Sequence, residues 1–229
     1  MPLARKRIAV TGAFGSLGAA VVAAALEAGA QVAALDRAAA PAGLDPRVHA
    51  FGGADVADGD GARAAIDAAA RALGGLDALV NIAGTFRWET VADGELATWD
   101  LLYRVNLRSA VATSQAAVPH LRASGGGRIV NIGAGAAAKA GAGMGAYAAS
   151  KAGVARLTEA LAEELKDERI TVNAVLPSII DTPPNRADMP EADFDRWVKP
   201  GQLADVIVFL LSDRAAAITG ALLPVSGRV

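Results

Sequence analysis

The 229-residue chain contains no cysteine and only two histidines. Without cysteine it cannot form disulfide bonds, use a thiolate nucleophile or bind a metal through thiolates. His49 and His120 lie far apart in the sequence, and neither has a carboxylate or histidine partner at the spacing of metal ligands. We therefore expect neither thiol chemistry nor a metal site.

The chain also lacks long apolar runs and blocks of one charge. No apolar run reaches the roughly 18 residues of a membrane-spanning helix, and the first residues lack the apolar segment and cleavage site of a signal peptide. The 22 basic and 24 acidic side chains are interleaved and give a net charge of −2. We expect a cytoplasmic protein that acts on a small molecule, with no nucleic-acid or membrane partner.

The composition is that of a globular protein, with 53% hydrophobic and 20% charged residues. Short apolar stretches without clean alternation predict strands covered on both faces, and stretches with helical spacing separate them. The predicted strands are residues 7–11, 31–35, a short one near Val48, 78–82, 128–132, 170–176 and 222–225, and the predicted helices are residues 17–28, 62–73, 95–121, 147–166 and 203–211. No repeat or linker divides the chain. We therefore expect residues 1–229 to form a single α/β domain, with a doubly wound parallel sheet in a three-layer α/β/α arrangement.

A glycine-bearing turn, residues 11–18, lies between the first predicted strand and the first predicted helix. A helix N-terminus presents unpaired N–H groups and partial positive charge, and residues without side chains let a pyrophosphate approach the backbone. A flexible turn in an alanine-rich protein is the alternative, but the strand–turn–helix context favours cofactor binding. The predicted contacts are Gly12, Phe14, Gly15, Ser16, Leu17 and Gly18.

Asp36 ends the second predicted strand, roughly 20 residues beyond the turn. An acid at this place can accept hydrogen bonds from the hydroxyl groups of the adenosine ribose, and it would repel a 2′-phosphate. The adjacent Arg37 could accommodate such a phosphate. NAD(H) is therefore the favoured cofactor, and NADP(H) stays open.

Tyr147 and Lys151 are spaced i, i+4, which places both side chains on one helix face. A free tyrosine titrates near about 10. An adjacent ammonium, together with the positive nicotinamide of an oxidised cofactor, is expected to lower this pKa and suit the phenol to proton transfer. Taken alone, the spacing also occurs in ordinary surface helices.

Three motifs in the same order resemble those of the short-chain dehydrogenase/reductase family, namely the glycine turn, Asn81-Ile-Ala-Gly84 and Tyr147-Ala-Ala-Ser-Lys151. The resemblance runs from about residue 7 to about residue 226. It implies a Rossmann-like sheet, typically of seven parallel strands, and an NAD(P)-dependent oxidoreductase. Because homo-oligomers are usual in the family, it also implies a homodimer or homotetramer.

The resemblance also implies roles for individual residues. Tyr147 would supply the proton, Lys151 would anchor the cofactor ribose and tune Tyr147, and Asn106 would support a water-linked proton relay. The implied cofactor contacts are Asp55 and Val56 at the adenine, Asn81, Ala83 and Gly84 in a strand-stabilising and ribose-facing segment, and Pro177, Ile180 and Thr182 at the nicotinamide carboxamide.

The sequence departs from the family pattern at the third catalytic position. The family places a serine thirteen residues before the tyrosine, where this chain has Ala134 between two glycines. Ser16 also replaces a glycine of the turn, and Pro177-Ser178 replaces Pro-Gly. Either the chain is a non-catalytic dinucleotide binder, or it is a serine-less ketone or 3-oxoacyl reductase, or its substrate does not need the missing hydroxyl.

A loop at about residues 181–200 supports the last alternative, because it resembles the corresponding loop of dihydropteridine reductases, which also lack the serine. Their substrate, a quinonoid dihydropterin, is flat and conjugated. Pro183-Pro184 are expected to stiffen the start of the loop. Trp197 would either cover a flat ring or anchor the loop to the core, and Ala134, Met144 and Trp88 are further candidates for the substrate pocket.

Overall fold

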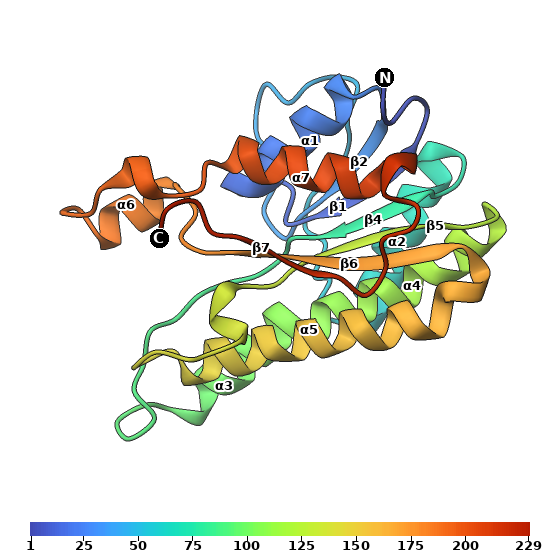
Figure 1. Cartoon of the computed structure of the whole chain (residues 1–229). Helices are drawn as coiled ribbons and strands as arrows, with labels where there is room; N and C mark the ends of the chain where they lie inside the picture. Colours follow the sequence, from blue (N-terminus) through green and yellow to red (C-terminus); the bar gives the residue numbers. More distant parts are fainter.

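The computed structural model describes residues 1–229 and has a seven-stranded sheet at its centre (Figure 1). The strands are β1 (Arg7–Thr11), β2 (Gln31–Leu35), β3 (His49–Phe51), β4 (Ala78–Asn81), β5 (Gly127–Ile132), β6 (Ile170–Pro177) and β7 (Leu222–Val225). Their order is β3-β2-β1-β4-β5-β6-β7, and every neighbouring pair is parallel. The strand order reverses between β1 and β4, so the carboxyl ends of these strands form the topological switch point of the sheet.

Helices cover both faces of the sheet. They are α1 (Ser16–Glu27), α2 (Gly59–Leu73), α3 (Leu96–Leu102), α4 (Ser109–Ala123), α5 (Gly145–Leu165), α6 (Pro183–Asp188) and α7 (Pro200–Leu211). Figure 1 shows α1 and α7 above the sheet and α4 and α5 below it. The predicted Rossmann-like, three-layer α/β/α domain is therefore confirmed. None of the helices is both long and apolar enough to span a bilayer.

Apolar and polar residues do not alternate cleanly along the strands, because helices cover both faces of the sheet. In β1, Ile8 and Val10 belong to the core beneath α1 and α7, whereas Ala9 points into the second core beneath α2, α4 and α5. All eight residues of β6 are buried. Both faces of the central strands therefore need apolar side chains.

The predicted helix over residues 95–121 differs from the structure. It is divided into α3, a π-helical segment (Tyr103–Arg108) and α4. A π-helical turn places an extra residue in the helix and changes the direction of the side chains around it. Asn106 lies in this segment and is buried.

The loop at residues 181–200 also contains more regular structure than expected. Pro183, expected only to stiffen the chain, is the first residue of the short helix α6. Proline suits this position because its fixed φ is helical and its missing N–H would have had no partner within the helix. The threonine before it, Thr182, caps the helix by accepting a hydrogen bond from the Asn185 backbone N–H.

Candidate functional site

A cavity of about 600 Å³ lies at the carboxyl ends of β1, β2 and β4, where the strand order reverses. Thirteen of the residues predicted to bind a cofactor line it: Gly12, Phe14, Gly15, Ser16, Leu17, Gly18, Asp36, Arg37, Asp55, Val56, Ala83, Gly84 and Thr182. Asn81, Pro177, Ile180, Tyr147 and Lys151 do not line it. The site therefore divides into this open cavity and a more buried group of polar side chains behind it.

The glycine turn fits tightly between β1 and β4. Gly12 has a φ of +64°, and a Cβ there would lie 2.8 Å from the backbone nitrogen of Ala83. A Cβ on Gly18 would lie 2.1 Å from the carbonyl oxygen of Gly12. These two positions accept only glycine because backbone passes directly against them.

Gly15 has a different role, because a Cβ there would meet only the Gly12 carbonyl oxygen, at 3.6 Å. It faces the cavity and is the N-cap of α1, with no side-chain hydrogen bond at that cap. The first N–H groups of α1 are therefore free of side-chain partners beside an open cavity. This arrangement fits the pyrophosphate of a dinucleotide. Ser16, which stands in place of the usual glycine, is the first residue of α1 and also lines the cavity.

Asp36, predicted to contact the adenosine ribose, lines the cavity and is held by two backbone groups. Its carboxylate accepts hydrogen bonds from the backbone N–H groups of Phe14, at 3.0 Å, and Ala38, at 2.9 Å. Each bond uses a different carboxylate oxygen, so each oxygen keeps acceptor capacity for a ribose hydroxyl. The exposed Arg37 stands beside it at the cavity wall.

The wall next to Asp36 is formed by Asp55 and Val56. Val56 is buried, whereas the Asp55 carboxylate forms an ion pair with Arg104 of the π-helical segment, with 2.6 Å between Oδ2 and Nη2. Asp55 also accepts a hydrogen bond from the Ala57 backbone N–H. This side of the cavity is therefore tied to the helix that carries Asn106.

Lys151 is only 5% exposed, and its Nζ donates a hydrogen bond to the carbonyl oxygen of Ile132, at 2.7 Å. Burial lowers the pKa of Lys151 to about 8. Burial also raises the pKa of the Tyr147 phenol to about 12. In the free protein desolvation thus moves the pKa of the phenol upward. The expected lowering of this pKa, which involves an oxidised cofactor as well as the ammonium of Lys151, stays a prediction.

Asn106 connects three parts of the site. Its Oδ1 accepts a hydrogen bond from the Thr85 backbone N–H at 2.7 Å, and its Nδ2 donates to the Thr85 carbonyl and to Ser150 Oγ, both at 3.0 Å. Ser150 Oγ in turn donates to the Tyr147 carbonyl at 2.7 Å. A Cβ on Gly84 would lie 3.2 Å from Asn106 Oδ1 and 3.5 Å from Lys151 Nζ, so these groups meet at one point. The water relay itself stays a prediction.

Ala134, the position of the missing serine, is buried and has an extended backbone after β5. The hydroxyl of Ser150 donates to the backbone and does not replace the one that is lacking. The phenol of Tyr147 is instead flanked by Phe86, whose ring meets it edge to face with 5.0 Å between centroids.

The candidate pocket residues lie in different settings. Trp197 is 4% exposed and packs against Phe194 with 4.8 Å between ring centroids, which agrees with the alternative in which it anchors the loop. Trp88 is 62% exposed and covers Gly143, where a Cβ would lie 2.1 Å from its indole. Met144 is the half-buried N-cap of α5.

The residues predicted to contact the nicotinamide carboxamide lie in different local structures. Pro177 is buried at the end of β6, and Ile180 forms a bridge with Val198. Asn81 is buried, and its side chain connects β4 to β5 and to α4. Its Nδ2 donates to Asn131 Oδ1 at 2.9 Å, and its Oδ1 accepts from Thr113 at 2.7 Å.

Sequence reasoning missed the lining residues that come after Gly84. They are Thr85, Arg87, Leu101, Val105 and Ser109, and Phe86 lies beside Tyr147. Leu101, Val105 and Ser109 are spaced four residues apart, which is a helical pattern that could have indicated a shared face.

Comparisons with known proteins agree with this geometry. Residues 6–192 match the family model for short chain dehydrogenases. The chain is 33% identical to 2-(S)-hydroxypropyl-CoM dehydrogenase 3 of Xanthobacter autotrophicus, over 96% of this chain and 94% of the relative. It is 36% identical to D-threitol dehydrogenase of Mycolicibacterium smegmatis, over 95% and 90%.

A solved structure of 3-ketoacyl-(acyl-carrier-protein) reductase from Brucella melitensis, complexed with NADH, superimposes with a TM-score of 0.90. It is 28% identical and covers 99% of each chain. The chain belongs to the short-chain dehydrogenase/reductase family. It is an oxidoreductase that uses a nicotinamide dinucleotide.

Gly15→Ala is expected to weaken NADH binding at least about tenfold, because Gly15 lines the cavity and the added methyl group would occupy space there. The φ of −77° suits alanine, so the melting temperature should change little. Fluorescence titration with NADH measures the affinity. Gly201→Ala, at a helical glycine with open space around it, is the control and should bind NADH normally. Equal affinity of the Gly15 variant and the parent would contradict the placement of the pyrophosphate.

The lowered pKa of Lys151 predicts a dependence of stability on pH. Between about pH 8 and the ordinary value of 10.5, the unfolded chain binds more protons at this site than the folded chain, so the contribution of Lys151 to stability rises with pH. Relative to Lys151→Met, the parent should gain about 1–3 kcal/mol in free energy of unfolding between pH 7 and pH 9.5. Urea unfolding at both pH values measures this gain. The exposed Lys139→Met serves as the control, and parallel curves for parent and Lys151→Met would contradict the prediction.

Proposed function

We propose that the chain is an NADH-dependent reductase of a small, flat, conjugated or carbonyl-bearing molecule. The observation that carries this proposal is that Lys151 and Asn106 meet at Gly84, on the wall of a cavity at the switch point of the sheet. Tyr147 lies one helical turn before Lys151 in α5, and Asn106 supports its backbone through Ser150. A binding protein without catalysis would need the cavity, but it would not need a buried lysine one helical turn from a tyrosine. Homo-oligomerisation, usual in the family, is part of the same proposal.

NAD(H) is the proposed cofactor in preference to NADP(H). The Asp36 carboxylate lines the adenosine end and is held in place by two backbone N–H groups. A fixed negative charge there opposes a 2′-phosphate. The NADH complex of the Brucella melitensis reductase supports the same preference.

When bound, the nicotinamide carries the hydride. The Tyr147 phenol is protonated at neutral pH, as an ordinary tyrosine is, and burial in the free protein raises its pKa further. In this proposal it donates the proton in the direction of reduction. Lys151 is held at the Ile132 carbonyl, one helical turn from Tyr147, and in this proposal it anchors the cofactor ribose and tunes the phenol. The Asn106 side chain holds Thr85 and Ser150, and through Ser150 it supports the backbone of Tyr147.

The absence of a hydroxyl group at Ala134 affects which kind of substrate the protein can reduce. Reduction of a ketone builds negative charge on oxygen, and the loss of one preorganised donor costs about 10²–10³ in rate. A conjugated ring such as a quinonoid dihydropterin takes up hydride and proton without an alkoxide that needs a clamp. We therefore propose a substrate of this kind. The resemblance of residues 181–200 to the corresponding loop of dihydropteridine reductases supports it.

A second candidate is a ketone or 3-oxoacyl reductase. It is favoured by the relatives, which are named as dehydrogenases of a hydroxypropyl compound and of D-threitol and as a 3-ketoacyl reductase. The third, a dinucleotide binder without catalysis, predicts NADH binding and no turnover.

An NADH-oxidation screen with quinonoid dihydropterin, simple ketones and quinones separates these candidates. Ala134→Ser is the matched variant, because the extended backbone at this position accepts serine. For the dihydropterin we expect turnover by the parent and little change on adding the hydroxyl. Ketone turnover should rise at least about tenfold in the variant. Turnover of ketones alone by the parent would remove the dihydropterin assignment, and no turnover of any compound would support the non-catalytic alternative.

Tyr147→Phe should lower kcat by about 10²–10⁴, because it removes the proton donor and keeps the ring that packs against Phe86. The Kd for NADH should stay within about threefold of the parent value, since the phenol lies outside the cavity lining. Steady-state kinetics and NADH fluorescence measure the two effects. Turnover at the parental rate would show that another group donates the proton.

A further inference from the structure

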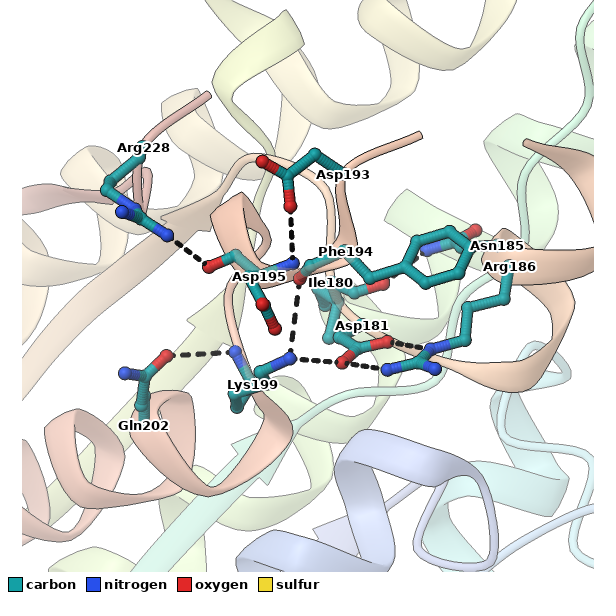
Figure 2. Close-up of polar contacts among 10 residues, drawn as sticks. All are labelled: Ile180, Asp181, Asn185, Arg186, Asp193, Phe194, Asp195, Lys199, Gln202 and Arg228. Carbon is teal, nitrogen blue, oxygen red and sulfur yellow. Dashed lines mark hydrogen bonds and ion pairs between the residues drawn. The ribbon is translucent and has the colours of Figure 1, made fainter. Parts of the chain in front are cut away.

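A charged cluster outside the catalytic group joins the two ends of residues 181–199. Its centre is Asp181, whose side chain is only 8% exposed. Arg186 donates two hydrogen bonds to this carboxylate, from Nε at 2.5 Å and from Nη2 at 2.9 Å, and Lys199 Nζ donates a third at 2.6 Å. Figure 2 shows Asp181 between these two cations, which come from α6 and from the residue preceding α7.

The backbone joins the same two ends. The Asp181 N–H donates to the Val198 carbonyl at 2.8 Å, and the Val198 N–H donates to the Ile179 carbonyl at 3.0 Å. These bonds form a short parallel bridge between Ile180 and Val198. The segment is therefore a closed loop with its charged cluster at the point of closure.

The middle of the segment is attached to the same carboxylate through its two partners. The Arg186 guanidinium lies over the Phe194 ring, 4.5 Å from its centroid, and Phe194 packs against the buried Trp197. Lys199 Nζ also donates to the Phe194 carbonyl at 3.3 Å. Removal of the Asp181 charge would leave both cations without their shared charged acceptor and would loosen the start, middle and end of the segment together.

The cluster adjoins the cavity through Thr182. This residue follows Asp181 directly, lines the cavity and caps α6. Asn185 of α6 also donates a hydrogen bond to the Ile180 carbonyl at 2.7 Å, so the residues on both sides of Asp181 are held by the helix. The position of Thr182 at the cavity wall thus depends on the closed segment.

We propose that Asp181 is a positioning residue that keeps residues 181–199 ordered in the free protein, so that Thr182 already lies at the cavity before NADH binds. The inference rests on the proposed NADH cofactor. A segment that is already ordered in the free protein loses little conformational freedom when NADH binds. A segment that is ordered only part of the time lowers the apparent affinity by the fraction that is ordered.

Asp181→Asn tests this role, and Asp193→Asn is the matched control. Asp193 belongs to the same segment and undergoes the same chemical change, but its carboxylate accepts only a local backbone hydrogen bond from Asp195. Amide hydrogen exchange of residues 181–199, with and without NADH, reports the order of the segment. Fluorescence titration gives the NADH affinity, and steady-state kinetics separate kcat from KM.

For the parent and Asp193→Asn we expect slow exchange that NADH changes by less than about twofold. For Asp181→Asn we expect exchange at least about tenfold faster without NADH, recovery with NADH, and an NADH Kd raised at least about fivefold. The kcat at saturation should stay within about threefold. Parental exchange in Asp181→Asn, or faster exchange with unchanged affinity, would overturn the proposal.

Lys199→Gln and Arg186→Gln provide a second test if Asp181→Asn does not fold. Each removes one partner and keeps the carboxylate, so each should give an intermediate effect on exchange and on affinity. Parental behaviour of both variants would also overturn the proposal. Failure of the parent to bind NADH would contradict the proposed cofactor instead, and exchange without NADH would still decide whether Asp181 orders the segment.

Discussion

The cofactor end of the molecule depends on how closely β1 and β4 approach where they leave the sheet. Gly12 lies against the backbone of Ala83, and the Thr11 hydroxyl accepts hydrogen bonds from the N–H groups of Ile82, at 3.1 Å, and Ala83, at 3.3 Å. This contact makes the glycine turn and the Ala83–Gly84 stretch two walls of one cavity. Because it consists of backbone against backbone, it tolerates no side chain at Gly12.

The chemistry depends in turn on how α5 is attached to the sheet. Lys151 reaches the Ile132 carbonyl, and farther along the helix Thr158 accepts a hydrogen bond from the buried Asn131 of β5. Asn106 adds a third attachment through Ser150. These buried polar contacts fix the depth and rotation of the helix, so that Tyr147 has a defined place although Ala134 offers no hydroxyl beside it.

Much of the fold and of the cofactor end followed from local patterns. The order of strands and helices was predicted because burial on both faces and helical spacing each produce a recognisable pattern of apolar residues within one segment. The glycine turn and Asp36 were predicted because their chemistry depends on a position directly after a strand. Pairs such as Tyr147 and Lys151 were placed on one face by the helix period alone.

By itself, then, the sequence determined the α/β order, the cofactor turn and the absence of the serine at Ala134. Only the tertiary structure decided that a π-helical turn carries Asn106 to Ser150, that Phe86 flanks Tyr147, that burial raises the tyrosine pKa, and that Asp181 closes residues 181–199. Each of these depends on packing or on desolvation between segments distant in the chain. The periodicity of apolar residues within one helix or strand carries no information about such contacts. It describes neighbours along that element and not contacts between elements.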